Sequence, residues 1–215
     1  MFWEKIFRAK NVSKLIILVL LIGFIVYFSG PKHPSLTFFN ESDSIDFNNG
    51  DIILRRGKSL ISQIVLLKDK DSEYSHVGIV VIQNDQPYVV HAVPGEAEKD
   101  MPEYVKMETM QEFLDSEKTV DFAVYTMASP DNTIRQKVAE KALTYFNQHI
   151  EFDSEFNLAD DSRLYCTELV WQAYKAAGIN LIKSYDKINI PFYKGDFIYP
   201  SDIFKNPNFK RLYPN

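Results

Sequence analysis

The sequence predicts an α+β fold in which an antiparallel sheet packs against helices, and three observations support this class. Two β-rich runs at 77–82 and 88–93 flank the turn sequence QNDQP at 83–87, a pattern typical of a β-hairpin. Two later segments, 129–146 and 164–177, repeat apolar residues with the period of a helix. The β-type segments are grouped rather than strictly alternating with helices, which favours α+β over a parallel α/β sheet.

One strand and one helix are expected before the hairpin. Residues 51–55 (DIILR) are typical of a short buried strand, and Ser59 is expected to begin a helix. The apolar set of that helix is Leu60, Ile61, Ile64, Val65 and Leu67.

The hairpin register decides where two histidines lie. If the turn centres between Asn84 and Asp85, His91 faces Gly78. His76 then lies on the same face as a diagonal neighbour of His91, about 7 to 8 Å away between α-carbons. A slip of one residue would send His91 to the other face and leave His76 unaffected.

Four further elements are expected after the hairpin. Thr109 with Glu112 three residues later is a capping-box pattern, so a short helix should end near residue 114. Residues 122–127 have strand composition. A longer helix opens at 129–130, and a last helix covers 164–177 with Gly178 as its expected stop. The apolar stripe of the longer helix is Ile134, Val138, Ala142, Tyr145 and Phe146.

The amino terminus predicts a membrane-targeting helix. Residues 15–28 are uncharged and apolar, and they follow four basic residues at positions 5, 8, 10 and 14. A 14-residue helix covers about 21 Å, short of the roughly 30 Å hydrocarbon core, unless flanking residues are drawn in. The positions before a possible cut lack the small residues that signal peptidases prefer, which favours an uncleaved signal anchor over a cleaved peptide or a buried core helix.

These features divide the chain into a signal anchor at 1–30, a polar stalk at 31–49 and a folded domain at 50–215. The basic residues before the apolar run place the amino terminus in the cytoplasm and the domain outside it, in the periplasm or cell envelope. A cleaved, secreted form is the alternative.

Composition excludes several classes of partner and cofactor. The 24 Lys and Arg against 29 Asp and Glu give a formal net charge of −5, so we expect no nucleic-acid partner. The single cysteine, Cys166, excludes an intrachain disulfide and a Cys-rich zinc site. A zinc site built from Cys166 and the two hairpin histidines matches no compact zinc motif, so we expect neither a metal nor another cofactor.

Cys166, His76 and His91 are the candidates for chemistry. A lone cysteine on an apolar helix face is most often an inert small hydrophobe. Near the first turn of a helix, however, unpaired N–H groups and the backbone dipole lower a thiol pKa, and the same groups can bind an oxyanion. A base for Cys166 and a second polar group that orients the base would complete a thiol nucleophile.

Three segments resemble one family. Gly50-Asp51-Ile52-Ile53, the run YSHVGIV at 74–80 and the run YCTELV at 165–170 resemble the circularly permuted papain-like cysteine amidases of the YiiX type. That family belongs to the NlpC-like superfamily, alongside lecithin retinol acyltransferase. The resemblance covers about 50–204 and includes the segment PSDI at 200–203, like the family's closing turn.

The resemblance implies a circularly permuted papain-like fold and a role for each candidate. Cys166 would be the nucleophile, His76 the general base and His91 the third, orienting residue, although family members vary at this last position. Tyr165 and Tyr74 flank the two main residues and would line the substrate pocket, with plain packing as the alternative.

The function that follows is that of a membrane-anchored cysteine hydrolase, amidase or acyltransferase. The substrate would be a small molecule, a cell-wall peptide or a lipid-derived acyl group, bound as an acyl-thioester on Cys166. The alternative is a non-catalytic lipid- or peptide-binding module on the same scaffold. Arg55 and Arg56 are expected to be solvated at a strand end, and the acidic segment from Glu96 to Glu108 is expected to be a solvated loop.

Overall fold

The computed structural model describes residues 45–96, 101–129, 131–159, 161–190 and 193–214. The predicted anchor at 1–30 and residues 31–44 of the predicted stalk lie outside the described residues. Within the described residues, no helix combines the length and apolar character needed to cross a membrane. The anchor and the division into three segments stay predictions.

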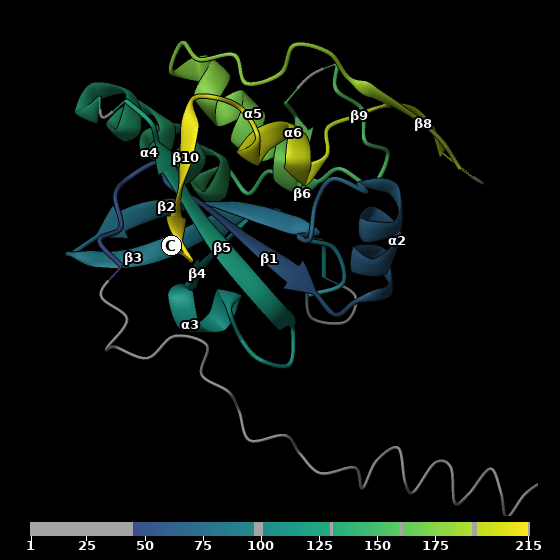
Figure 1. Cartoon of the computed structure of the whole chain (residues 1–215), viewed down its shortest axis with the longest axis horizontal. Coiled ribbons are helices and arrows are strands. Elements are labelled where there is room, and N and C mark those ends of the chain that lie inside the picture. The colour runs from purple at the N-terminus through teal and green to yellow at the C-terminus, as the bar shows by residue number, and fades with distance from the viewer. Residues whose placement is uncertain (1–44, 97–100, 130, 160, 191–192, 215) are drawn as a thin grey trace, which may run out of the picture. The chain divides into compact units, whose positions relative to one another are not determined.

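A six-stranded antiparallel sheet organises the fold and confirms the predicted α+β class (Figure 1). Its order is β10-β5-β1-β2-β3-β4, and every neighbouring pair runs antiparallel. The strands are β1 (Ile52–Gly57), β2 (His76–Gln83), β3 (Gln86–His91), β4 (Lys106–Thr109), β5 (Thr119–Met127) and β10 (Phe209–Tyr213). The central strands β1 and β2 are almost wholly buried, because both faces of the sheet are covered.

Each face of the sheet carries its own apolar cluster, because alternate residues of a strand point to opposite sides. Ile52 and Leu54 of β1 join the larger cluster, which the long helices α4 (Asn132–Asn147) and α5 (Cys166–Ala176) complete. Ile53 joins the smaller cluster, to which the short helix α3 (Met110–Phe113) contributes Phe113. Figure 1 shows α4 and α5 on one side of the sheet and α3 on the other.

The remaining elements surround this core. Two helices are α2 (Leu60–Lys68) and α6 (Pro200–Phe204). Two small sheets pair β6 (Glu151–Phe152) with β7 (Arg163–Leu164) in parallel, and β8 (Asp186–Ile190) with β9 (Tyr193–Phe197) in antiparallel orientation. The sequence did not predict β4, β6 to β10 or α6 as regular elements.

The predicted helix boundaries are confirmed where a cap or stop residue indicated them. Ser59 caps α2 and accepts a hydrogen bond from the amide of Ser62, and the capping box of Thr109 and Glu112 opens α3. α5 ends before Gly178, which adopts a φ of +93°, a conformation that favours glycine.

The predicted hairpin register is also confirmed. Ile79 pairs with Val90 and Gln83 with Gln86, so the turn centres on Asn84 and Asp85, both with positive φ. His91 therefore lies beside Gly78, where an added Cβ would come within 3.2 Å of the His91 Cβ. The missing side chain at Gly78 leaves room for the two histidines.

Candidate active site

The two histidines and an acidic residue form a hydrogen-bonded chain. His76 Nε2 lies 2.9 Å from His91 Nδ1, and His91 Nε2 lies 2.9 Å from Glu108 Oε2. His76 and Glu108 are buried, and His91 is fully inaccessible to solvent. β4 supplies Glu108 opposite Val89, two residues from His91 on the same face of β3.

These two hydrogen bonds determine which ring nitrogens carry protons. The ionised Glu108 carboxylate only accepts, so His91 Nε2 must donate, and Nδ1 of a neutral His91 is then an acceptor. His76 Nε2 in turn must donate to that acceptor. Nδ1 of a neutral His76, the ring nitrogen nearer the main chain, is left with the lone pair and is the basic nitrogen of this chain.

The Cys166 thiol lies beside the backbone at the start of β2. The amide groups of Val77, Thr167 and Cys166 itself lie close enough to the sulfur to lower its pKa. Val77 is the second residue of β2 and directly follows His76. The thiol and His76 Nδ1 thus both lie near the His76–Val77 peptide.

The thiol and the imidazole rings are not stacked on one face of the sheet. Both rings contact Phe113 on the α3 side, whereas α5 packs through Leu169 and Val170 into the cluster on the opposite side. The hydrogen bond of the His76 ring goes to His91, and Cys166 itself packs against the cluster on the α5 side.

Burial raises the pKa of the Cys166 thiol to about 11 and outweighs the three amide groups and the Arg55 charge, which lower it. The side chain is only partly accessible to solvent. The expectation that the helix start would leave a thiolate near neutral pH is therefore wrong for this resting structure, because desolvation penalises the charged form more than the helix start stabilises it.

Both histidines are neutral at neutral pH. Burial lowers the pKa of His76 well below its usual value, and the Arg55 charge acts in the same direction. Burial also lowers the pKa of His91, against the opposing effect of Glu108. Burial alone would raise the pKa of Glu108, but hydrogen bonds from His91 and Lys106, together with the Lys106 charge, hold it far below its ordinary value.

A buried arginine lies beside the histidines, contrary to the sequence expectation. Arg55 is 3% exposed, donates to the Phe113 carbonyl at 2.8 Å and pairs with Glu96 at 2.6 Å. Its guanidinium lies 4.7 Å from the centre of the Phe113 ring. Arg56, by contrast, is exposed as expected.

Sequence reasoning missed Glu108 and Glu96 as well. Both were assigned to a solvated loop, but Glu108 belongs to the sheet, and Glu96 accepts from Arg55 and also pairs with Lys106 and Lys118. The alternation of Lys106 and Glu108 with apolar neighbours just before the capping box is the pattern that would have indicated a strand here.

The two tyrosines are buried and already hydrogen-bonded. The Tyr165 hydroxyl accepts from the Ile198 amide at 3.0 Å, and its ring stacks on Phe197. The Tyr74 hydroxyl accepts from Arg211 at 2.8 Å. These contacts are those of packed side chains, and the role of both tyrosines in substrate binding stays a prediction.

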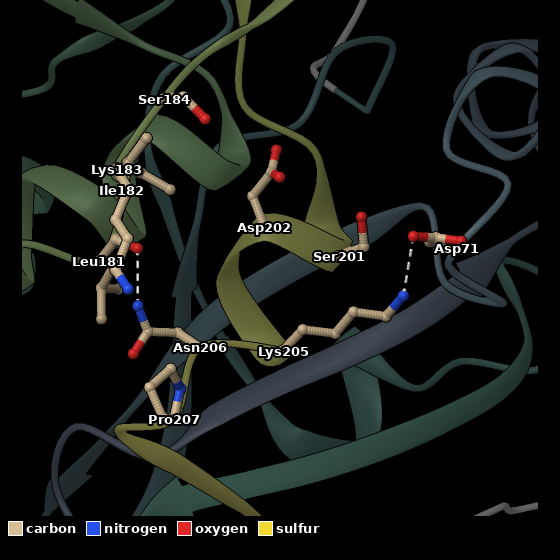
Figure 2. Close-up of a pocket in the computed structure, with 10 residues that line it drawn as sticks. All are labelled: Asp71, Leu181, Ile182, Lys183, Ser184, Ser201, Asp202, Lys205, Asn206 and Pro207. Carbon is tan, nitrogen blue, oxygen red and sulfur yellow. Dashed lines mark hydrogen bonds and ion pairs between the residues drawn. The ribbon is translucent and has the colours of Figure 1, made fainter.

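A separate cavity of about 280 Å³ lies beside α6 (Figure 2). An ion pair between Lys205 and Asp71 spans 3.0 Å at its rim, and Asn206 donates to the Leu181 carbonyl. Neither Cys166 nor either hairpin histidine lines it, so this cavity is not part of the candidate active site.

Comparisons with known proteins identify the family of this chain. Residues 46–213 match the family model described as "Permuted papain-like amidase enzyme, YaeF/YiiX, C92 family". The chain is 30% identical over 129 residues to the "Uncharacterized protein YiiX" of Escherichia coli K12, covering 60% of this chain and 57% of that relative.

A solved structure shares the fold. The crystal structure of "metalloprotein yiiX from Escherichia coli O157:H7" superposes with a TM-score of 0.63 at 24% identity, covering 78% of this chain and 97% of that one. At this identity the likeness concerns the fold alone. The family match covers most of the chain, and the chain therefore belongs to the YaeF/YiiX family of permuted papain-like amidases.

Proposed function

We propose that the chain is a cysteine amidase or acyltransferase in which Cys166 is the nucleophile and His76 the general base. The observation that carries this proposal is the row of hydrogen bonds from Glu108 through His91 to His76. It leaves His76 Nδ1 as a base beside the Val77 amide, which is close to the thiol. We assign His91 to orienting His76, and Glu108 to orienting His91.

The proposed mechanism starts from a neutral thiol and a neutral imidazole. As the Cys166 sulfur attacks the carbonyl carbon of an amide or ester, the thiol proton passes to His76 Nδ1. Amide groups at the start of α5 stabilise the oxyanion. The resulting imidazolium gives its proton to the leaving amine or alcohol, and water or another acceptor then cleaves the thioester.

The experiment is intact-mass analysis of the full chain after exposure to a mixed library of acyl donors. Because Cys166 is the single cysteine, an acyl increment that disappears in Cys166→Ser identifies the nucleophile and the acyl class together. The base is tested by His76→Asn, with His149→Asn as its matched control, because His149 is exposed and has a positive φ that asparagine tolerates. Equal acylation of both histidine variants and the parent would contradict the assignment of His76.

The alternative is a non-catalytic module that binds a lipid or peptide on the same scaffold. Two observations favour it: burial raises the pKa of the Cys166 thiol, so the thiol is uncharged, and Cys166 packs against the larger apolar cluster. Under this alternative, no donor acylates the parent protein, and Cys166→Ser binds its ligand unchanged.

We also propose that the protein is anchored in a bacterial membrane with this domain outside the cytoplasm, acting on cell-wall peptides or lipid-derived acyl groups. The apolar run at 15–28 and its basic flank support this proposal. Intact mass of the protein from the membrane fraction tests it. A chain beginning at Met1 supports the anchor, and a soluble chain that begins after residue 28 supports the cleaved form.

We derive no metal-dependent step. The similar crystal structure is described as that of a metalloprotein. In the present chain, the hydrogen bonds among His76, His91 and Glu108 occupy three of the four histidine ring nitrogens. Among the residues that the structure describes, no three or more His, Cys, Asp or Glu side chains are arranged so that they could hold a metal ion. These residues do not fit a metal ion.

A further inference from the structure

Helix α2 presents an apolar stripe to solvent. Of the seven large apolar side chains that are exposed in the described part of the chain, four belong to this nine-residue helix. Leu60 is 84% exposed and Leu67 is 72% exposed, and about half of Ile61 and Ile64 is exposed. No residue of α2 is buried, so this is a surface helix with an apolar outer face.

The positions in the helix place the most exposed residues together. Leu60, Ile64 and Leu67 follow the spacing i, i+4 and i+7, which aligns them along one side. The less exposed Val65 and Leu66 lie toward the opposite side, facing the protein. The solvent-facing side of α2 is therefore apolar, whereas the solvent-facing side of a surface helix is usually polar.

Basic residues outnumber acidic ones around this stripe, where the exposed acidic residues are Asp71, which pairs with Lys205, and Glu73. Lys58, Lys68 and Lys70 flank α2 and are exposed. The single acidic residue between them, Asp69, is buried and accepts hydrogen bonds from the amide and the hydroxyl of Ser201. Arg56 adds a further positive charge but faces Asp121 across the β1–β5 pair, so we base the argument on the three lysines.

We propose that α2 is a membrane-docking helix for anionic lipid surfaces. Leu60, Ile64 and Leu67 enter the boundary between headgroups and acyl chains, and the flanking lysines contact anionic headgroups. A bilayer suits this face better than a protein partner does, because lysine is depleted from protein interfaces, whereas its long apolar stem and charged end match a membrane interface.

This docking would also position the candidate site. α2 directly follows β1, which carries Arg55, and the loop after α2 leads into His76 at the start of β2. Both ends of the helix thus connect to strands that carry residues of the hydrogen-bonded site. The proposal rests on α2 alone and holds whether or not Cys166 is a nucleophile.

The experiment measures the local depth of α2 in a bilayer, because membrane association alone would not separate α2 from the amino-terminal segment. Full-length Cys166→Ser protein carries an environment-sensitive fluorophore at Gln63→Cys, on the outer side of α2. It is reconstituted in vesicles of phosphatidylcholine with or without phosphatidylglycerol. The matched control carries the label at Lys137→Cys, an exposed position of α4.

The expected result is a blue shift, a several-fold rise in emission and quenching by brominated lipids at position 63, only with phosphatidylglycerol and not at position 137. Replacing Leu60, Ile64 and Leu67 by serine, or the three lysines by glutamine, should abolish it, whereas Met101→Ser at another exposed apolar position should not. No shift at position 63, an equal shift in pure phosphatidylcholine, or a lipid-independent shift that grows with protein concentration would each overturn the proposal. Circular dichroism shows whether each variant is folded.

Discussion

Replacing Glu108 by glutamine tests the proposed relay at the point farthest from the thiol. The substitution keeps the size of the side chain but removes the charge that accepts from His91 at 2.9 Å and from Lys106 at 3.0 Å. The new amide group can also donate to His91 Nε2. That donation would reverse the proton positions in both rings and leave a proton on His76 Nδ1, where the mechanism requires a lone pair.

The structure indicates the size of the effect. One hydrogen bond to a charged group contributes about 1.5–3 kcal/mol. If the relay acts only in the transition state, this loss lowers the acylation rate roughly 10- to 200-fold, at about 1.36 kcal/mol for each factor of ten. Because Glu108 also pairs with Lys106 and with Lys118 at 3.5 Å, the folded state loses stability as well.

Stoichiometric acylation by p-nitrophenyl acetate, followed by absorbance and by intact mass, measures the effect on Cys166 directly. The control is Glu117→Gln, the same substitution at an exposed position in the same region. Glu108→Gln protein that is folded by circular dichroism and acylates as fast as this control would refute the relay.

Three other predictions concern pH and stability. The rate of Cys166 alkylation by iodoacetamide should still rise at about pH 9, because the thiol pKa is about 11, and a plateau below about pH 7 would show a thiolate instead. The free energy of unfolding should fall as the pH drops below about 6.5, by up to about 1.4 kcal/mol per pH unit for each histidine. The reason is that the lowered pKa values of His76 and His91 let the unfolded chain take up protons first. Urea unfolding at several pH values measures this slope, which His91→Gln should reduce and which would be absent if the rings were solvated. Arg55→Met should cost about 1.5–3 kcal/mol of stability in the same assay, since it removes hydrogen bonds from a buried charge, and an unchanged midpoint would contradict that role.

The sequence predicted local structure well where a single residue marks it. The turn at Asn84 and Asp85 determined the hairpin register, and with it the approach of His76 to His91. Ser59 and Thr109 indicated helix starts through their hydrogen-bonding side chains. Each of these predictions depends on contacts within a few residues of the chain, which a local pattern records.

Features that depend on distant contacts were not predictable in the same way. Glu108 is buried because its strand pairs with β3, and Arg55 is buried because Glu96 and Phe113 come from elsewhere in the chain. The pKa of Cys166 likewise depends on how densely the fold surrounds the sulfur, which the position of the residue at a helix start does not reveal. In α2 the pattern indicated the helix, but nothing local indicated that its apolar side stays exposed.

The short helix α3 links an exposed capping residue to the buried histidines. α3 has four residues, and its Phe113 ring touches Arg55, His76 and His91 at once. Its amino end is held by the exposed capping residue Thr109. Removing the Thr109 cap would therefore let the Phe113 ring shift, and both imidazole rings could then rotate. A substitution at an exposed position would then disturb the alignment of the buried His76 and His91 rings.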